Sequence, residues 1–393
     1  MEAVLNSGAR HAVLGASSAF RWLNCLPSAL REAEKEDRDT SFTREGTAAH
    51  WLAANLAALI SDVERDPDPD GDAEAKAILA ETDPCDKEEM NRHAEGYATF
   101  VRERLAEARR RSSDAVVLLE RRVDFSGIVP GGFGTADCLV IADGVMEVID
   151  YKYGKGVRVY AEDNPQMALY ALGALSAYGW DYDVRKVVMT IYQPRLGHVD
   201  TWERTADELW RWAGGECQPK ALLAAQGKGA YSCGEWCRFC KVRAECGHYA
   251  TQMAGVAALH IREPEISLEV LGRDVLPVAA SMKAWIAGVE ERALKEAVAG
   301  ATVPGWKVVE GKGRRVIVDP EAARKALEEA GYADILKPAE LLPMTTLEKM
   351  AGRKRFAELC GAWIEKRPGK PALAPEGDAR DPFDVSGDFD AFE

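Results

Sequence analysis

The sequence predicts an α/β fold in which helices flank a mixed β-sheet. Three observations lead to this class. Residues 115–125 form an apolar run that is typical of a strand, and residues 134–151 form two more such runs around Asp143-Gly144. Residues 164–179 have a helical pattern, and another strand-like run follows at 186–194. The order helix, three strands, helix, strand therefore predicts a sheet with both kinds of pairing.

The elements before the sheet are predicted from periodicity and breakers. We expect a helix near 17–34, a second near 44–60, an acidic loop over 61–90 and a helix near 88–111. The helix after the hairpin has a good start signal, because Asn164 suits the N-cap and Pro165 suits the first helical position.

The C-terminal part is predicted to be mostly helical. A cysteine-rich segment at 233–246 follows the core, and helices are expected near 266–299, 319–330 and 345–365, with a hairpin over 305–318. The sequence thus divides into an α/β domain over 1–250, a helical region over 251–367 and an acidic tail over 368–393, whose composition is typical of disorder.

The hairpin brings two acids and a lysine together. Asp143-Gly144 is typical of a two-residue type I′ turn, and this turn would pair Asp137 with Asp150. Lys152 would share their face, because side chains alternate along a strand. Opposed carboxylates repel, whereas Mg²⁺ or Mn²⁺ would be coordinated by them and the lysine could orient a water. The alternative is a solvated face on which Lys152 is only a salt-bridge partner.

The charge distribution does not exclude a nucleic-acid partner. The net charge is −14, but residues 61–90 carry twelve acids against three bases and residues 374–393 carry seven against one. The remainder is close to neutral and has basic clusters beside the motifs. No apolar run approaches the roughly 18 residues that cross a membrane, and the N-terminus lacks the features of a secretory signal. A cytoplasmic location is therefore expected.

Three further residues are candidates for a site. His50 lies on the helix near 44–60, and although most helical histidines are structural, a neutral imidazole would complement two aspartates around a metal. Gln166 and Tyr170 are four residues apart and share one helix face. Tyr170 could be a core residue with its hydroxyl at the rim, or the pair could face a substrate.

The cysteine spacing indicates a metal site rather than disulfides. Cys237, Cys240 and Cys246 lie close together in the sequence. The fourth thiolate could be Cys233, which would make a compact knot, or Cys25, which would tie the N-terminal helix to the end of the core. Spacing alone does not separate zinc from an iron–sulfur cluster.

Together these motifs resemble a known nuclease branch. A helical histidine, D…DxK on a hairpin, QxxxY and clustered cysteines with one far upstream are similar to the RecB-like branch of the PD-(D/E)XK superfamily, which includes the CRISPR-associated adaptation nucleases. The segments "FRWLNCLPSA", "GTADCLVI", "VIDYKYGKGV", "NPQMALYALGAL" and "CRFCKVRAEC" also resemble the phage and prophage group called domain of unknown function 2800. The resemblance covers residues 15–250 well.

The resemblance implies a restriction-endonuclease-like core that cleaves DNA. His50, Asp137 and Asp150 would bind Mg²⁺ or Mn²⁺, and Lys152 would act on the attacking water or the scissile phosphate. Gln166 and Tyr170 would position the DNA strand. The implied activity is that of an exonuclease on single- or double-stranded DNA ends in recombination or replication. The rival expectation is a non-catalytic module that keeps the fold and binds nucleic-acid ends or proteins.

The resemblance also implies a cofactor and partners. Its iron–sulfur ligands match Cys25, Cys237, Cys240 and Cys246, which would hold a 4Fe–4S cluster, with Cys233 as an extra thiol and zinc as the alternative. The acidic tail could meet a single-strand-binding or recombination protein. An oligomer is compatible with the resemblance, and no membrane partner is expected.

Overall fold

The computed structural model describes residues 12–35, 40–63, 65–262 and 267–306. The chain divides into two units, residues 1–314 and 315–393. The helices expected near 319–330 and 345–365 and the acidic tail lie outside the described residues, as does nearly all of the hairpin expected over 305–318. The domain boundaries at 250 and 367 therefore stay predictions.

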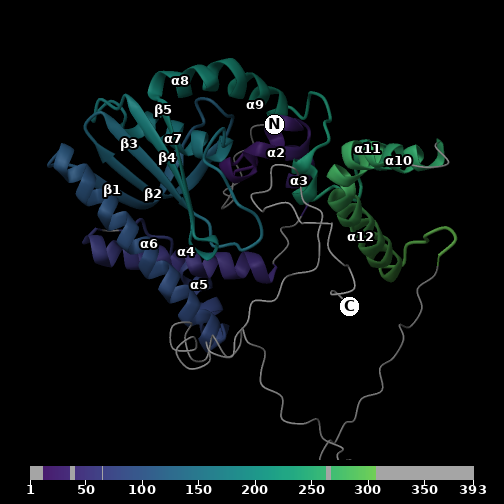
Figure 1. Ribbon diagram of the computed structural model, residues 1–393, viewed down its shortest axis with the longest axis horizontal. Coiled ribbons are helices and arrows are strands. Elements are labelled where there is room, and N and C mark those ends of the chain that lie inside the picture. The colour runs from purple at the N-terminus through teal and green to yellow at the C-terminus, as the bar shows by residue number, and fades with distance from the viewer. Residues whose placement is uncertain (1–11, 36–39, 64, 263–266, 307–393) are drawn as a thin grey trace, which may run out of the picture. The chain divides into compact units, whose positions relative to one another are not determined.

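The core of the described part is a five-stranded sheet in the order β1-β2-β3-β4-β5. Its strands are β1 Val116–Asp124, β2 Phe133–Ala142, β3 Val145–Tyr151, β4 Lys186–Gln193 and β5 His198–Thr205. Neighbours pair antiparallel except β3 and β4, which are parallel. Helix α7 (Pro165–Tyr178) connects these two strands and covers the sheet (Figure 1). The predicted mixed α/β sheet is confirmed, and β5 is a strand that the sequence pattern missed.

The hairpin has the predicted register but not the predicted turn. Ala142 pairs with Val145 and Cys138 with Ile149, so the next opposed residues are the two aspartates. Gly144 has φ +77°, but among the described non-glycine residues positive φ occurs only at Asp62, Glu120, Asp163 and Asp183. Because a type I′ turn needs positive φ at both central residues, that part of the prediction was wrong. The predicted register is nevertheless confirmed, because the loop still has two residues.

Helices α4 (Ser41–Ser61) and α6 (Pro84–Arg111) cover one face of the sheet (Figure 1). Thr40 begins α4 with a capping box, which satisfies backbone donors of the first turn. Buried alanines such as Ala49, Ala53 and Ala57 let α4 pack closely against α6. The two helices and one face of β1–β3 form one hydrophobic cluster.

The acidic segment 61–90 is largely helical, so the predicted loop was wrong. It contains α5 (Pro69–Glu81) and the start of α6. Asp68 accepts a hydrogen bond from the Gly71 N–H at 3.1 Å, and Asp83 accepts one from the Cys85 N–H at 2.8 Å. Each aspartate is an N-cap followed by a proline, so part of this acidic composition serves to begin helices.

The other face of the sheet is covered by α7 and the N-terminal segment. Asn164 caps α7 and Pro165 is its first residue, as predicted. The single helix expected over 17–34 is broken into α2 (Ala19–Asn24) and α3 (Ser28–Ala33). Pro27 explains the break, because it restricts the residue before it and has no N–H to donate. Cys25 ends α2 at this break.

Two short 3₁₀ turns lie before α2 (Ala16–Ser18) and between β4 and β5 (Pro194–Leu196). The elements after the sheet are α8 Ala206–Trp212, a π-helical turn at Ala213–Cys217, α9 Gln218–Ala225, a 3₁₀ turn at Glu235–Phe239, α10 Gly247–Arg262, α11 Leu268–Val270, a π-helical turn at Leu271–Val275 and α12 Leu276–Val298. The last three fall within the helix expected near 266–299. None of the helices in the described part is long and apolar enough to cross a lipid bilayer.

Candidate active site

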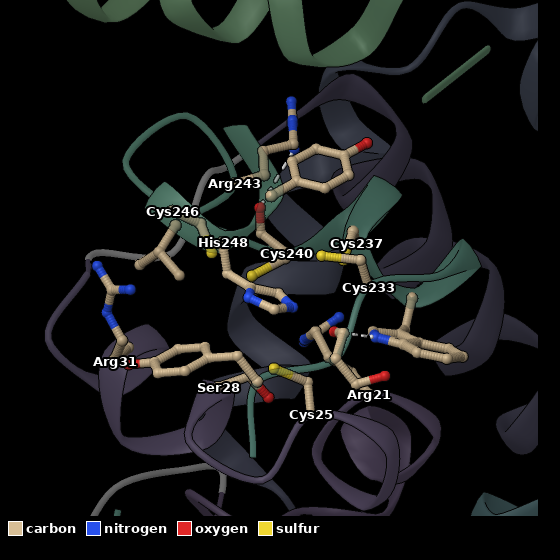
Figure 2. A pocket seen from close by; sticks show the side chains of 15 residues that line it. Arg21, Cys25, Ser28, Arg31, Cys233, Cys237, Cys240, Arg243, Cys246 and His248 are labelled. Carbon is tan, nitrogen blue, oxygen red and sulfur yellow. Dashed lines mark hydrogen bonds between the residues drawn. The ribbon is translucent and has the colours of Figure 1, made fainter. Parts of the chain in front are cut away.

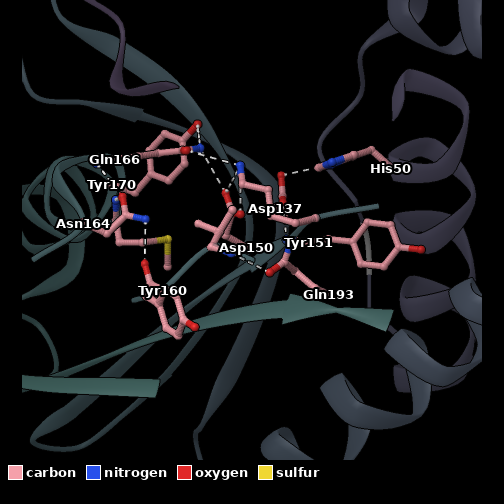
Figure 3. A network of polar contacts seen from close by, with 12 residues as sticks. His50, Asp137, Asp150, Tyr151, Tyr160, Asn164, Gln166, Tyr170 and Gln193 are labelled. Carbon is pink, nitrogen blue, oxygen red and sulfur yellow. Dashed lines mark hydrogen bonds and ion pairs between the residues drawn. The ribbon is translucent and has the colours of Figure 1, made fainter. Parts of the chain in front are cut away.

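The predicted site residues gather where β2 and β3 meet helices from both faces of the sheet. Figure 3 shows His50 of α4 pointing at Asp137 of β2, and Asp150 of β3 facing Gln166 and Tyr170 of α7. His50 Nδ1 lies 3.3 Å from Asp137 Oδ1. The Tyr151 backbone N–H donates to the other oxygen of Asp137 at 2.6 Å. The carboxylate is therefore held by β3 on one side and by α4 on the other.

Asp150, Lys152, Gln166 and Tyr170 form one hydrogen-bonded network. Lys152 Nζ lies 3.0 Å from Asp150 Oδ2 and donates to Gln166 Oε1 at 3.2 Å. Gln166 Nε2 donates to Asp150 Oδ1 at 3.0 Å and to the Tyr170 hydroxyl at 3.3 Å. The glutamine thus fixes both the acid and the lysine, and the two ends of the QxxxY motif share a face as predicted.

Glu120 is a site residue that the sequence did not reveal. It lies in β1 between the pairs Leu119–Cys138 and Arg121–Ala136, which places it opposite Asp137. One ligand atom each from His50, Glu120 and Asp137 lies within 4.8 Å of the others. In the described part of the chain no other such group of three histidine, cysteine or acidic residues occurs.

The backbone at Glu120 is strained. Its φ is +51°, a region that L-residues with side chains rarely adopt and that costs about 1–2 kcal/mol. The residue before it is anchored from outside the sheet, because the Asp66 N–H donates to the Leu119 carbonyl at 3.1 Å. Strain of this kind persists where the surroundings fix it, and it is concentrated at functional sites. Glu120 combines this strained backbone with a carboxylate that lies close to Asp137 and His50.

The pKa values of Glu120, His50 and Asp137 are shifted so that bound protons offset the negative charge of the two carboxylates. Burial and then the neighbouring Asp137 raise the pKa of Glu120 from 4.5 to about 8. Burial would lower the pKa of His50, but the charge and hydrogen bond of Asp137 outweigh it and raise that pKa to about 9. Burial also opposes ionisation of Asp137, yet His50 holds its pKa below the ordinary value. A divalent cation would take over the role of these protons.

Asp150, the second aspartate of the hairpin, is neutralised by a lysine and not by a histidine. Burial raises the pKa of Asp150, with Lys152 opposing the shift. Burial would lower the pKa of Lys152, but Asp150 and Asp137 raise it, so the ammonium stays charged. Asp150 Oδ2 is buried and lies near Lys152 Nζ, but the geometry gives it no hydrogen bond from any described residue. A buried oxygen in this condition suits a cation ligand.

The expected ligand set is only partly brought together. His50 and Asp137 are in contact as predicted, and Glu120 joins them. Asp150 lies opposite Asp137 on the hairpin but outside that group of three. A cavity of about 410 Å³ opens beside His50 and Glu120, between α4 and the start of α5. This cavity gives solvent and small ligands a route to the acids.

The chain matches a known protein family. The family described as "Protein of unknown function (DUF2800)" matches residues 11–381, which is nearly the whole chain. The chain belongs to the DUF2800 family. The match includes every candidate site residue named above and the whole cysteine-rich segment. The description of the DUF2800 family assigns no activity.

Five cysteines of the DUF2800 protein line one small cavity. They are Cys25, Cys233, Cys237, Cys240 and Cys246. Figure 2 shows Cys25, from the break between α2 and α3, across the cavity from the four cysteines of the 233–246 segment. Burial raises the pKa of Cys240 to about 12, which disfavours a thiolate without a metal. No three of these sulfurs lie within 4.8 Å of one another. Cys138 is fully buried in the core.

Proposed function

We propose that this protein is a metal-dependent DNA nuclease of the PD-(D/E)XK type, acting as an exonuclease on DNA ends. The observation that carries the proposal is the cluster of His50, Glu120 and Asp137 directly beside the Asp150–Lys152 pair. Hard divalent cations bind carboxylate oxygens, and a lysine beside such a site can act on a phosphate. A module that only bound nucleic acid would gain nothing from buried acids facing a phosphate.

The residues fit Mg²⁺ or Mn²⁺. His50, Glu120 and Asp137 would hold the cation, and Asp150, which lies opposite Asp137 on the hairpin, has a buried oxygen without a hydrogen bond. When bound, the cation would act as a Lewis acid and offset the charge that develops on the phosphate. Among the described residues, His50 is the cationic partner of Asp137 and Lys152 is the cationic partner of Asp150.

The lysine and its network would act on the substrate. Lys152 Nζ is held by Asp150 and Gln166 and keeps a third N–H to donate. That N–H would orient the attacking water or stabilise the negative charge on a phosphate oxygen. The Tyr170 hydroxyl accepts a hydrogen bond from Gln166 and can itself donate to a backbone phosphate. Since phosphate contacts carry no sequence information, cleavage should show little sequence preference and binding should weaken with salt.

We propose that the cysteine cavity holds a 4Fe–4S cluster through Cys25, Cys237, Cys240 and Cys246. Four thiolates around zinc, at about 2.3 Å each, would bring the sulfurs to about 3.8 Å from one another. No three of the described sulfurs fall within 4.8 Å of one another, so they are not gathered around one tetrahedral centre. The preference for iron–sulfur over zinc rests on the resemblance of the cysteine spacing to iron–sulfur ligands. The cytoplasmic location, an oligomer and a partner for the tail stay predictions.

Digestion of end-labelled DNA tests the nuclease. Linear single- and double-stranded DNA, labelled at either end, is incubated with Mg²⁺ or Mn²⁺ and the wild-type protein, Asp137→Ala or Lys152→Ala. We expect metal-dependent loss of label with wild type and a rate that falls on the order of 10²–10⁴-fold in both variants. Lys186→Ala is the matched control, because Lys186 is exposed at the far end of β4 and pairs with Glu203.

Two outcomes would contradict the proposal. One is full-rate cleavage by Asp137→Ala, since the acid cluster would then have no role in the reaction. The other is no cleavage by a folded, cluster-loaded wild-type protein on any of the labelled substrates. That result would favour the non-catalytic binding module instead.

A further inference from the structure

A third cavity, of about 420 Å³, lies at the N-terminus of α7. Its walls come from α2, from the start of α7 and from the segment that runs from β5 to α9, so three parts of the chain that are distant in the sequence build it. The volume is within the range of sites that bind small ligands or single groups of larger ones. Neither the proposed cation site nor the cysteine cavity includes any of its lining residues.

Flat aromatic surfaces dominate this cavity. Phe20, Trp202 and Trp212 contribute rings to its lining. The Phe20 side chain is 50 % exposed, and its ring lies edge-on to Trp236 with the ring centres 5.8 Å apart, so its flat face is left open. The Arg204 guanidinium lies over the Trp202 ring, 4.4 Å from its centre, and covers one face of that ring with its own planar group. Such surfaces stack well on another planar group.

The charges of the cavity are nearly balanced. Lys220 pairs with Glu216 at 2.8 Å, and Arg204 lies 3.6 Å from Glu208. Asp163 adds one further acid to the lining. The cavity therefore offers no net positive charge to a phosphate, and the group that it suits is neutral, planar and polar at its edges. A nucleobase has these properties.

The cavity is connected to the candidate active site through one residue. Asn164 forms part of the cavity wall, and its Oδ1 accepts a hydrogen bond from the Gln166 N–H at 3.0 Å. Gln166 in turn binds both Lys152 and Asp150. Figure 3 shows Asn164 beside Gln166 and Tyr170. A group in the cavity is thus separated from the reaction network by the first turn of α7.

The loop before α7 supplies positively charged side chains, which the cavity lacks. Lys155 and Arg158 are exposed in the loop that follows Lys152, and the Tyr160 side chain is 55 % exposed. The Asn164 amide donates to the Tyr160 carbonyl at 3.0 Å, which ties this loop to the cavity wall. A basic, aromatic loop next to a stacking cavity is the combination by which proteins hold an unpaired strand.

We infer that the aromatic cavity receives an unstacked base of a single DNA strand whose phosphate lies at Lys152. This inference rests on the proposed function and specifies its substrate as single-stranded, or as a frayed end. Bases inside a duplex are paired and stacked, so they would have to leave the helix before entering such a cavity. The exposed bases of a single strand enter without that cost.

Oligonucleotide binding in EDTA tests the inference without any cleavage. A fluorescein-labelled oligo-dT and a blunt duplex are titrated with the full-length protein, and the anisotropy is followed. Phe20→Ala is expected to weaken oligo-dT binding about 5- to 100-fold, as loss of one stacking partner does, and to leave duplex binding unchanged. Trp202→Phe should retain most of the affinity, because it preserves a ring.

Two control variants distinguish loss of stacking in the cavity from loss of any exposed aromatic side chain. Trp180 is 95 % exposed on the turn after α7, and Trp210 is 41 % exposed on α8, but neither lines the cavity. Trp180→Ala and Trp210→Ala should therefore bind oligo-dT as the wild type does. Wild-type affinity in Phe20→Ala, or an equal loss for the duplex, would overturn the inference. Circular dichroism of each variant confirms that it is folded.

The failure of the cavity assignment and the failure of the nuclease can be told apart. If the wild type cleaves DNA but Phe20→Ala binds oligo-dT normally, only the cavity assignment fails. If Phe20→Ala loses oligo-dT binding but the wild type cleaves nothing with Mn²⁺, the proposed reaction fails and the cavity assignment holds.

Discussion

Replacing Glu120 by glutamine should stabilise the metal-free protein. The pKa of this carboxyl is about 8 in the folded protein against an ordinary 4.5. At pH 7 the unfolded chain ionises Glu120 and the folded protein does not. This difference costs up to about 3 kcal/mol, at roughly 1.4 kcal/mol for each pH unit between 4.5 and 7. Glu120→Gln keeps the size of the side chain and removes that cost.

The sign of the effect gives it a characteristic pH dependence. A raised acid pKa destabilises the folded state above the unfolded pKa, because the proton is then lost only on unfolding. The gain in Glu120→Gln should be absent at pH 4.5, grow as the pH rises, and level off above pH 8. Urea unfolding in EDTA at pH 4.5, 7 and 8.5 measures it, with Glu95→Gln on the exposed face of α6 as the control.

Metal should reverse the order of stability. Mn²⁺ binds the folded protein and adds stability according to its affinity, and a neutral amide is a weaker ligand than a carboxylate. Wild type should therefore gain more stability from Mn²⁺ than Glu120→Gln does. The reasoning is refuted if Glu120→Gln is no more stable than wild type in EDTA at pH 7, or if its advantage is as large at pH 4.5.

Three further predictions concern the surroundings of the site. Asn164→Ala removes the α7 N-cap and should cost about 1 kcal/mol in urea unfolding. Gly134→Ala places a Cβ 2.7 Å from Tyr170 Cε1, so it should displace that ring, cost about 1–3 kcal/mol and slow DNA cleavage about tenfold. Cys25→Ser should lose its iron when purified without oxygen and absorb little near 400 nm, whereas Cys233→Ser should keep both.

Each of these has a control or an opposing result. The Asn164 prediction fails if the variant unfolds at the wild-type urea concentration. Gly127→Ala is the control for Gly134→Ala, because an added Cβ there meets nothing within 4 Å, and equal cleavage rates for the two variants would contradict the steric argument. Full iron in Cys25→Ser together with loss in Cys233→Ser would select the local set of ligands. Cys85→Ser should match the wild type.

The sequence predicted the part of the site that a short loop determines. A two-residue turn leaves only one register between β2 and β3, so Asp137 and Asp150 could be placed opposite each other by counting. Glu120 could not be found in this way. The connection between β1 and β2 runs from 125 to 132, and a loop of that length fixes no register. Its positive φ also has no signature in the sequence.

The elements that were missed lacked a clear pattern. β5 reads His198–Thr205 and alternates between half-buried and exposed residues, but its inward positions include histidine, aspartate and arginine as well as tryptophan. No apolar face was therefore visible. Acids at 68 and 83 were interpreted as loop composition, although a following proline makes each a helix start. The break at Cys25 could have been predicted from Pro27. The apolar pattern on both sides of this proline instead indicated one continuous helix.

The placing of α2 and α3 has a consequence for synthesis on the ribosome. These helices precede the sheet in the sequence, yet Glu32 of α3 accepts a hydrogen bond from the Lys241 N–H at 2.7 Å, and Lys35 pairs with Glu245 at 2.8 Å. Cys25 likewise completes a cavity whose other cysteines end at Cys246. More than two hundred residues must therefore be synthesised after Glu32 before α3 can make these contacts. All five strands of the sheet lie within that stretch, so they are synthesised before these contacts can form.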